Sequence, residues 1–429
     1  MGFFDKLFKK NEKSEEKAAK PKAEPKPAPK AEAPKAAPAQ PKASTGNPGP
    51  YDFIVPPVAS PNDGKIPKDA ILPAADLGPL LPGAPAGGKI KLAVYWCAAC
   101  GGCDVSLLDT HERLLTIGDM ADIVMWPIAE DGKEKDIEAM DDGEITVSII
   151  SGAVRNTENE HMAKLLRQKS KIVVAYGTCA AFGGSPALAN LVPGGAEEIL
   201  DYVYTKTPSS ASFQNEYHKD APQIPQEKTQ VPEGELTIPT LYDTVKTLDQ
   251  VIDVDYTVPG CPPLPESISQ LLKAVADFVY NGVPLPPKGT VVGTTTKTLC
   301  EECPRQKTGA RITELKEPFQ VDIDPNACLM EQGILCLGPA TMGGCGARCT
   351  RVGQPCRGCY GPSPDVQEQG ASIFTAVASL FPILDEDPTC GEDEIIRIMS
   401  SIKDPLGYFY AYTLGKSLIK RAVVEKGGN

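Results

Sequence analysis

Residues 300–359 contain eight cysteines and no histidine, a composition that could bind metal through sulfur alone. The eight are arranged as Cys300-x2-Cys303, Cys328-x7-Cys336, Cys345-x3-Cys349 and Cys356-x2-Cys359. A Cys-x-x-Cys pair brings two thiolates to one metal centre, and four thiolates complete either a zinc site or an iron–sulfur cluster. The spacing therefore predicts two all-thiolate metal centres.

Iron–sulfur clusters are the preferred interpretation of this segment, and a pair of structural zinc sites is the alternative. Pro304 follows Cys303 directly, and Gly358 lies between Cys356 and Cys359. Proline beside a ligand and glycine in the turn both suit a backbone that wraps closely around an inorganic core. A disulfide framework is disfavoured because nothing else in the sequence marks a secreted protein.

Four further cysteines occur earlier in the chain, each just after a predicted strand. They are Cys100 and Cys103 after the first strand, Cys179 after the fourth and Cys261 after the fifth. Each has glycine or proline within two residues, which permits close approach of the backbone. Because open parallel sheets bind ligands at the carboxyl edge, we expect these four to converge on one cluster.

Two cysteines remain outside these groups. Cys97 has the same spacing from Cys100 as Cys100 has from Cys103, so Cys97–Cys100 is an alternative pair; the glycines at 101 and 102 favour Cys100–Cys103. Cys390 is expected to be an ordinary thiol.

The elements that must position the first four cysteines alternate between strand and helix patterns. Strands are predicted at 91–96, 123–126, 146–150, 172–176 and 254–258, and helices near 157–169, 195–203 and 264–280. This alternation predicts an α/β fold with a flavodoxin-like, doubly wound parallel sheet. Helices and strands of that domain are expected to cease after Pro284, where a loop-rich iron–sulfur cluster domain begins. Residues 204–239 are expected to form an inserted surface loop.

The predicted organisation is therefore an amphipathic tip at 1–10, a linker and surface strap at 11–88, the sheet domain at 89–285 and the cluster domain at 286–429. Residues 11–46 consist of Lys, Ala, Pro and Glu without large apolar side chains, which predicts a disordered N-terminal extension. The tip MGFFDKLFKK offers a basic amphipathic tether to a membrane surface or to a partner protein, and a frayed terminus is the alternative.

Charge and signal content exclude several classes of protein. The net charge is -13, although residues 1–46 alone hold eleven lysines against six acids, so the remaining chain is strongly acidic. An acidic body argues against nucleic acid as a partner. There is no twin-arginine leader, cleavage site or apolar run of about 20 residues. We expect a cytoplasmic protein, peripherally attached to a membrane if the tip acts there.

These motifs together resemble the small, electron-transferring subunit of [NiFe] hydrogenases, most of all the cytoplasmic F420-non-reducing (methyl-viologen-reducing) type. The resemblance runs from about Lys89 to Leu414. It is carried by Cys100-Gly-Gly-Cys103, Gly177-Thr-Cys-Ala-Ala-Phe-Gly-Gly184, Pro259-Gly-Cys-Pro-Pro263, Gly353-Gln-Pro-Cys-Arg-Gly-Cys-Tyr-Gly-Pro362 and Asp404-Pro-Leu-Gly-Tyr-Phe-Tyr410.

The resemblance implies three [4Fe-4S] clusters. The first would use Cys100, Cys103, Cys179 and Cys261, the second Cys300, Cys303, Cys328 and Cys336, and the third Cys345, Cys349, Cys356 and Cys359. Periplasmic relatives have a histidine in place of Cys300 and often a three-iron cluster at the third position. Here a fourth cysteine argues for four irons.

The resemblance also implies partners. The chain lacks the terminal Cys-x-x-Cys pairs that hold nickel and iron in large hydrogenase subunits, so H2 would be cleaved on a partner large subunit. Electrons would leave to a downstream acceptor subunit, either an iron–sulfur adaptor of heterodisulfide reductase or a flavin subunit. The alternatives are a cluster subunit of a complex I-like or F420-reducing assembly, and a zinc-stabilised scaffold.

Overall fold

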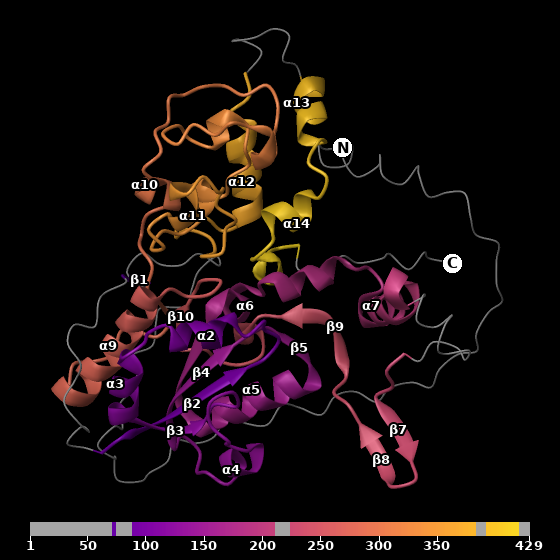
Figure 1. Ribbon diagram of the computed structural model, residues 1–429. Coiled ribbons are helices and arrows are strands. Elements are labelled where there is room, and N and C mark those ends of the chain that lie inside the picture. The colour runs from indigo at the N-terminus through magenta and orange to yellow at the C-terminus, as the bar shows by residue number, and fades with distance from the viewer. Residues whose placement is uncertain (1–70, 74–87, 211–223, 383–391, 420–429) are drawn as a thin grey trace.

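The computed structural model describes residues 71–73, 88–210, 224–382 and 392–419 (Figure 1). The predicted tip at 1–10, most of the predicted linker and strap at 11–88, and Cys390, which was predicted to be an ordinary thiol, lie outside these residues. No helix in the described ranges is long and apolar enough to cross a membrane.

A seven-stranded sheet forms the centre of the first domain, and all of its strand pairs are parallel. Its strands are β1 (Ile71–Leu72), β2 (Ile90–Trp96), β3 (Ala121–Met125), β4 (Ile145–Ser151), β6 (Ser170–Tyr176), β10 (Tyr256–Val258) and β11 (Thr290–Val292). Their spatial order is β1-β11-β10-β6-β4-β2-β3. The order β3-β2-β4-β6-β10 is the flavodoxin-like order, so the predicted fold class is confirmed.

Sequences rich in Val and Ile form the central strands. Every residue of β4, with the sequence ITVSIIS, is buried, as expected for a parallel strand that is covered on both faces. Two separate apolar cores cover those faces: one includes Leu107 and Leu271, and the other includes Met162 and Leu166. The sheet is therefore packed between two layers of helices.

Among its described residues, the first domain contains the three predicted helices, near 157–169, 195–203 and 264–280, and four others. They are α2 (Gly102–Leu108), α3 (Arg113–Met120), α4 (Glu134–Glu138), α5 (Thr157–Lys169), α6 (Gly177–Phe182), α7 (Gly195–Asp201) and α9 (Pro265–Asn281). In α5 the side chain of Asn156 accepts a hydrogen bond from the Asn159 amide, which satisfies one free N–H of the first turn. In α9 proline is the first residue, and Gly282 ends the helix in a left-handed conformation.

The structure corrects two expectations about the edges of this domain. Strand β11 pairs with β10, so the sheet continues beyond Pro284, where its strands were predicted to cease. β1, in the predicted surface strap, pairs with β11 as the edge strand. A segment as short as TVV carries too little periodicity to be separated from the loop-rich sequence that follows.

The insertion predicted at 204–239 contains structure of its own. Strands β7 (Lys228–Val231) and β8 (Gly234–Thr237) form an antiparallel hairpin that projects from the body in Figure 1. Residues 211–223 lie outside the described ranges. A second pair, β5 (Val154–Asn156) with β9 (Leu241–Lys246), connects the end of the insertion to the start of α5.

The second domain lies over one end of the sheet (Figure 1) and consists mainly of loops. Its helices are α10 (Leu299–Glu302), α11 (Arg348–Arg351), α12 (Gln369–Ala378), α13 (Glu392–Met399) and α14 (Pro405–Phe409). An apolar core containing Leu329, Ile373 and Leu414 also includes Ala187 from the first domain. The two domains therefore share one core.

Candidate metal centres

Three loops at the carboxyl ends of β2, β6 and β10 carry the first predicted set of cysteines, Cys100, Cys103, Cys179 and Cys261. The loop after β2 turns through Gly101, whose φ is 86°, and places Cys103 in the first turn of α2. Cys179 lies in α6, which begins directly after β6. Because neighbouring parallel strands end at the same edge, these loops lie side by side.

The four thiols of this first set are close enough to affect one another electrostatically. Burial raises the pKa of Cys103, and repulsion from Cys179, Cys261 and Cys100 raises it further. Burial, followed by repulsion from Cys261 and Cys100, raises the pKa of Cys179 to about 12. The structure therefore brings together all four residues that were predicted to converge.

Two glycines leave space for the sulfur atoms of the first set. A Cβ atom added to Gly177 would lie 2.4 Å from Cys103 Sγ, and one added to Gly184 would lie 2.5 Å from Cys179 Sγ. Both glycines have positive φ, 82° and 55°, which side-chain-bearing residues rarely adopt. The close approach that the predicted motif required is therefore present.

Cys97 lies apart from this set. Its Sγ is 3.8 Å from the carbonyl oxygen of Asn159, and it packs in the core that contains Met162, on the opposite face of the sheet from Cys103. Burial and then the nearby Glu158 raise its pKa to about 12, and no cysteine contributes. Cys97 directly follows β2 and packs on one face of the sheet, whereas Cys103 lies in α2 on the other face.

The second set, Cys300, Cys303, Cys328 and Cys336, gathers around α10 and the loop that precedes the second-domain core. Burial raises the pKa of Cys300 to about 12; the Lys307 cation opposes this effect, and repulsion from Cys336, Cys328 and Cys303 adds to it. Burial also raises the pKa of Cys336 to about 11, although N–H groups of Gly338 and Cys356 donate to its sulfur. Cys300 and Cys336 therefore each lie near the other thiols of this set.

The third set, Cys345, Cys349, Cys356 and Cys359, is assembled in the same way. Burial raises the pKa of Cys359 to about 12, with repulsion from Cys345, Cys261 and Cys349 as further causes. Burial is also the main cause of the raised pKa of Cys356, with Cys336 and Cys359 contributing. The third set therefore lies near Cys261 of the first set and near Cys336 of the second set.

Direct contacts place the third set between the first and the second. The Cys356 amide lies 3.3 Å from Cys336 Sγ in the second set. On the other side, Thr178 Oγ1, next to Cys179 of the first set, donates to the Cys359 carbonyl, and, after burial, the Cys261 thiol is among the causes that raise the pKa of Cys359. In space, the third set lies between the first set and the second set, whereas along the chain the second set comes before the third.

The donor chemistry of the three sets fits iron–sulfur clusters. Each set offers four thiols and no imidazole, the ligand pattern of a [4Fe-4S] centre. The described part of the chain contains thirteen free cysteines. Several backbone amides point at sulfur, including Gly102 to Cys100 at 3.4 Å and Gly358 to Cys356 at 3.4 Å. Such hydrogen bonds are a usual feature of cluster sites and help to set the cluster potential.

Glu302 is a positioning residue that the sequence analysis missed. Its carboxylate accepts hydrogen bonds from the Gly344 amide at 2.7 Å and the Gly346 amide at 3.1 Å. These two amides flank Cys345, whereas Glu302 itself precedes Cys303. One side chain thereby ties the loop of the third set to α10 of the second, and its position inside Cys300-Glu-Glu-Cys303 was the available signal.

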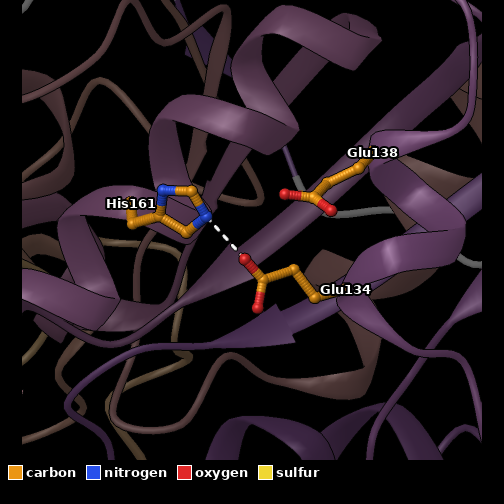
Figure 2. A group of neighbouring side chains, drawn as sticks. All are labelled: Glu134, Glu138 and His161. Atoms are coloured by element: carbon orange, nitrogen blue, oxygen red, sulfur yellow. Dashed lines mark hydrogen bonds and ion pairs between the residues drawn. The ribbon is translucent and has the colours of Figure 1, made fainter. Parts of the chain in front are cut away.

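A second group of potential ligands lies on the surface of the first domain and was also not predicted. Figure 2 shows His161 of α5 facing Glu134 and Glu138 of α4, with His161 Nε2 located 2.6 Å from Glu134 Oε1. All three side chains are exposed. We interpret this group as a surface contact that joins α4 to α5 and not as a metal centre, because the ring nitrogen already has a carboxylate partner.

Comparisons with known proteins agree with the cysteine pattern. Residues 100–275 match a family model described as NADH ubiquinone oxidoreductase, 20 Kd subunit. The chain is 39% identical over 342 residues to an iron–sulfur subunit of the F420-non-reducing hydrogenase of Archaeoglobus profundus, covering 78% of this chain and 99% of that protein. It is 35% identical to a subunit of the F420-non-reducing hydrogenase of Methanothermobacter marburgensis, covering 79% of this chain and 99% of the relative.

One solved structure, of an NAD+-reducing [NiFe]-hydrogenase in the H2-reduced state, aligns with 46% of this chain and 97% of the matched chain. The sequence identity is 29% and the TM-score is 0.36, so this alignment carries no argument about function.

Proposed function

This chain belongs to the family of F420-non-reducing hydrogenase iron–sulfur subunits, and we propose that it relays electrons from H2 oxidation on a partner large subunit to a downstream acceptor subunit. The relay would use three [4Fe-4S] clusters, held by the first, third and second cysteine sets in that spatial order. Each cluster, when bound, would accept and donate one electron at a time. The hydrogenase and iron–sulfur character follows from the relatives, whereas the ligands, the cluster number and the order are our proposal.

The observation that carries the proposal is the contact of the third set with both of the others. The rate of electron tunnelling falls off exponentially with distance. A subunit that transfers electrons across its width therefore needs a row of closely spaced redox centres. The Cys356 amide contacts Cys336 Sγ in the second set, and Thr178, which precedes Cys179 of the first set, donates to the Cys359 carbonyl, so the third set is in contact with the loops of both others. Zinc sites with only a structural role would have no need of this continuity.

We propose that the large subunit docks where the first set reaches the surface. Cys100 and Cys261 are exposed residues, and next to Cys100 in the sequence the apolar side chains of Trp96, Val105 and Leu108 are also exposed. Apolar side chains that remain uncovered beside a candidate cluster site are typical of an interface with another chain. Covering them would also exclude water from the first cluster.

The downstream acceptor is proposed to dock near the second set. The loop that carries Phe319 is held beside Ile334 by a hydrogen bond from the Lys316 amide to the Gly333 carbonyl at 2.8 Å. Phe319 is 84% exposed, and Ile334 is two residues from Cys336. An exposed aromatic side chain is a common anchor for a protein partner.

Iron analysis of anaerobically purified protein tests the number of clusters. Three cubanes predict about twelve irons for each chain, following four per cluster. Cys349→Ser should lower the iron content by about one to four irons, because the three remaining cysteines hold at most a three-iron cluster. Cys97→Ser is the matched control and should retain all of the iron. Zinc in place of iron, or equal iron in both variants, would refute the proposal.

The family model favours one second candidate, a cluster subunit of a complex I-like assembly. That match covers residues 100–275 and therefore only the first cysteine set. The hydrogenase relatives extend over 78–79% of the chain. Mass spectrometry of co-purified partners decides between the candidates: a large hydrogenase subunit supports our proposal, and a quinone-reducing assembly overturns it. The same experiment identifies the acceptor, including a flavin subunit that reduces F420.

We further propose a cytoplasmic location, with residues 1–10 as a tether to a membrane surface or a partner. This proposal rests on the sequence of the tip alone. Deletion of residues 1–46, followed by cell fractionation, tests it. If the truncated protein has the same distribution among the cell fractions and assembles with the same partners as the full chain, the proposed tether is wrong.

A further inference from the structure

Arg305 carries a buried positive charge beside the second cysteine set. The residue is 9% exposed and follows Cys303 by two positions. An arginine side chain remains protonated in proteins, and a buried charge is costly unless an opposite charge lies close to it. The positive charge of Arg305 therefore requires a negative partner inside the protein.

Within the described part of the chain, the hydrogen bonds of the Arg305 side chain end on backbone carbonyls. Its Nε donates to Thr350 O at 2.7 Å, and its Nη1 donates to Asp324 O at 2.7 Å and Ala327 O at 3.0 Å. Carbonyls satisfy the N–H groups but carry no net charge. These bonds therefore fix the position of the guanidinium without neutralising it.

The nearby carboxylates are directed elsewhere. The Asp324 side chain accepts a hydrogen bond from the Asn326 amide at 2.8 Å, so Asp324 offers Arg305 its carbonyl and not its charge. Glu302 accepts from the amides of Gly344 and Gly346. No ion pair between Arg305 and a carboxylate occurs among the residues that the structure describes.

The guanidinium is instead surrounded by backbone that bears the cysteines. Ala327 precedes Cys328, and Thr350 follows Cys349. The thiol of Cys303 lies 3.2 Å from Thr350 Oγ1, and the carbonyl of the same threonine accepts from Arg305. Arg305 is therefore anchored where the second and third sets meet, between the backbone beside Cys328 and the backbone beside Cys349.

We propose that Arg305 is the buried counter-charge of the second cysteine set and raises the reduction potential of the cluster held there. Four thiolate ligands make a [4Fe-4S] centre negative overall, and the added electron makes it more so. A fixed cation at short range and low dielectric favours that more negative state. The cluster at the end of the file would then accept an electron readily from the third set. This inference rests on the proposed function.

The test is a redox titration, monitored by electron paramagnetic resonance, of the assembled hydrogenase complex. The variants are Arg305→Gln, which removes the charge, and Arg305→Lys, which keeps it. Arg311→Gln is the control: Arg311 lies in the same domain, is exposed and donates to the carbonyl of Ser379 at 2.7 Å. The signal of the second cluster is identified by its loss in Cys328→Ser.

We expect Arg305→Gln to lower the midpoint potential of the second cluster, and Arg305→Lys and Arg311→Gln to leave it near the wild-type value. Loss of the second cluster in Arg305→Gln with full iron in Arg305→Lys also supports the counter-charge. An unchanged midpoint in a fully loaded Arg305→Gln protein, or equal loss of iron in the glutamine and lysine variants, overturns it. Failure of the proposed function is distinct, because the wild-type protein would then contain no clusters to titrate.

Discussion

Replacement of Gly177 by alanine should remove the first cluster while a matched glycine replacement does not. Gly177 is buried with φ 82°, and a Cβ placed there would lie 2.4 Å from Cys103 Sγ. Gly282, at the end of α9, has φ 64° and nothing within 4 Å of its added Cβ. The two variants share the backbone strain, and only Gly177→Ala adds the collision with sulfur.

The expected magnitudes follow from this difference. A left-handed alanine costs roughly 1–2 kcal/mol, which lowers the thermal midpoint of a domain of this size by about 2–8 °C. Gly282→Ala should show this cost alone and retain its iron. In Gly177→Ala the sulfur must also move, so a further fall in the midpoint and the loss of about four irons are expected.

Anaerobic iron analysis together with thermal melts of wild-type, Gly177→Ala and Gly282→Ala protein measures both quantities. A Gly177→Ala protein with full iron and the same midpoint as Gly282→Ala would refute the argument that Gly177 makes room for a ligating sulfur. Loss of iron in Gly282→Ala would show instead that backbone strain anywhere in the domain releases the cluster.

Three further predictions concern stability and docking. Asp255→Asn should destabilise the sheet domain by about 1.5–3 kcal/mol, because the buried carboxylate accepts a 2.5 Å hydrogen bond from Arg167; an unchanged thermal midpoint would contradict this. The hydrogen bond from Lys164 is the main cause that lowers the pKa of Glu160 from 4.5 to about 2. The ionised Glu160 side chain therefore contributes about 1 kcal/mol to the free energy of unfolding above pH 4.5, and this contribution is lost as the pH falls toward 2. The difference in midpoint between wild-type and Glu160→Gln protein should shrink over that range, and a difference independent of pH would exclude the pair as its cause. Phe319→Ser should leave iron content and midpoint unchanged but slow electron delivery to the co-purified acceptor, and full transfer rates would place that partner elsewhere.

The parallel sheet was predictable because its strands are marked locally. The run ITVSIIS is rich in β-branched residues and is buried on both faces, and the helix that follows β5 is marked by the Asn156 cap. The edges were not predictable in the same way. Strands β1 and β11 have only two and three residues, which is too short for an alternating apolar pattern. They form strands because β1 pairs with β11 at the edge of the sheet.

The distinction between Cys97 and Cys103 depended on which face of the sheet each thiol occupies. Their spacings to Cys100 are identical, so the sequence favoured one pair only through its glycines. In the folded chain the end of β2 directs Cys97 into one core, whereas Cys103 enters the other with α2. Two cysteines six positions apart can therefore belong to opposite layers of the same sheet.

The candidate sulfur ligands, and their grouping with glycine and proline, can be read from the sequence itself, because cysteine spacing and turn residues act over a few neighbouring positions; their role as ligands stays a prediction. Only the tertiary structure decided that the third set lies between the other two and that Arg305 is buried without a carboxylate partner among the described residues. Both features depend on contacts between loops that are distant in the chain, such as the hydrogen bond from Thr178 to the Cys359 carbonyl. Such contacts form when two domains share one core, and no local pattern of residues records them.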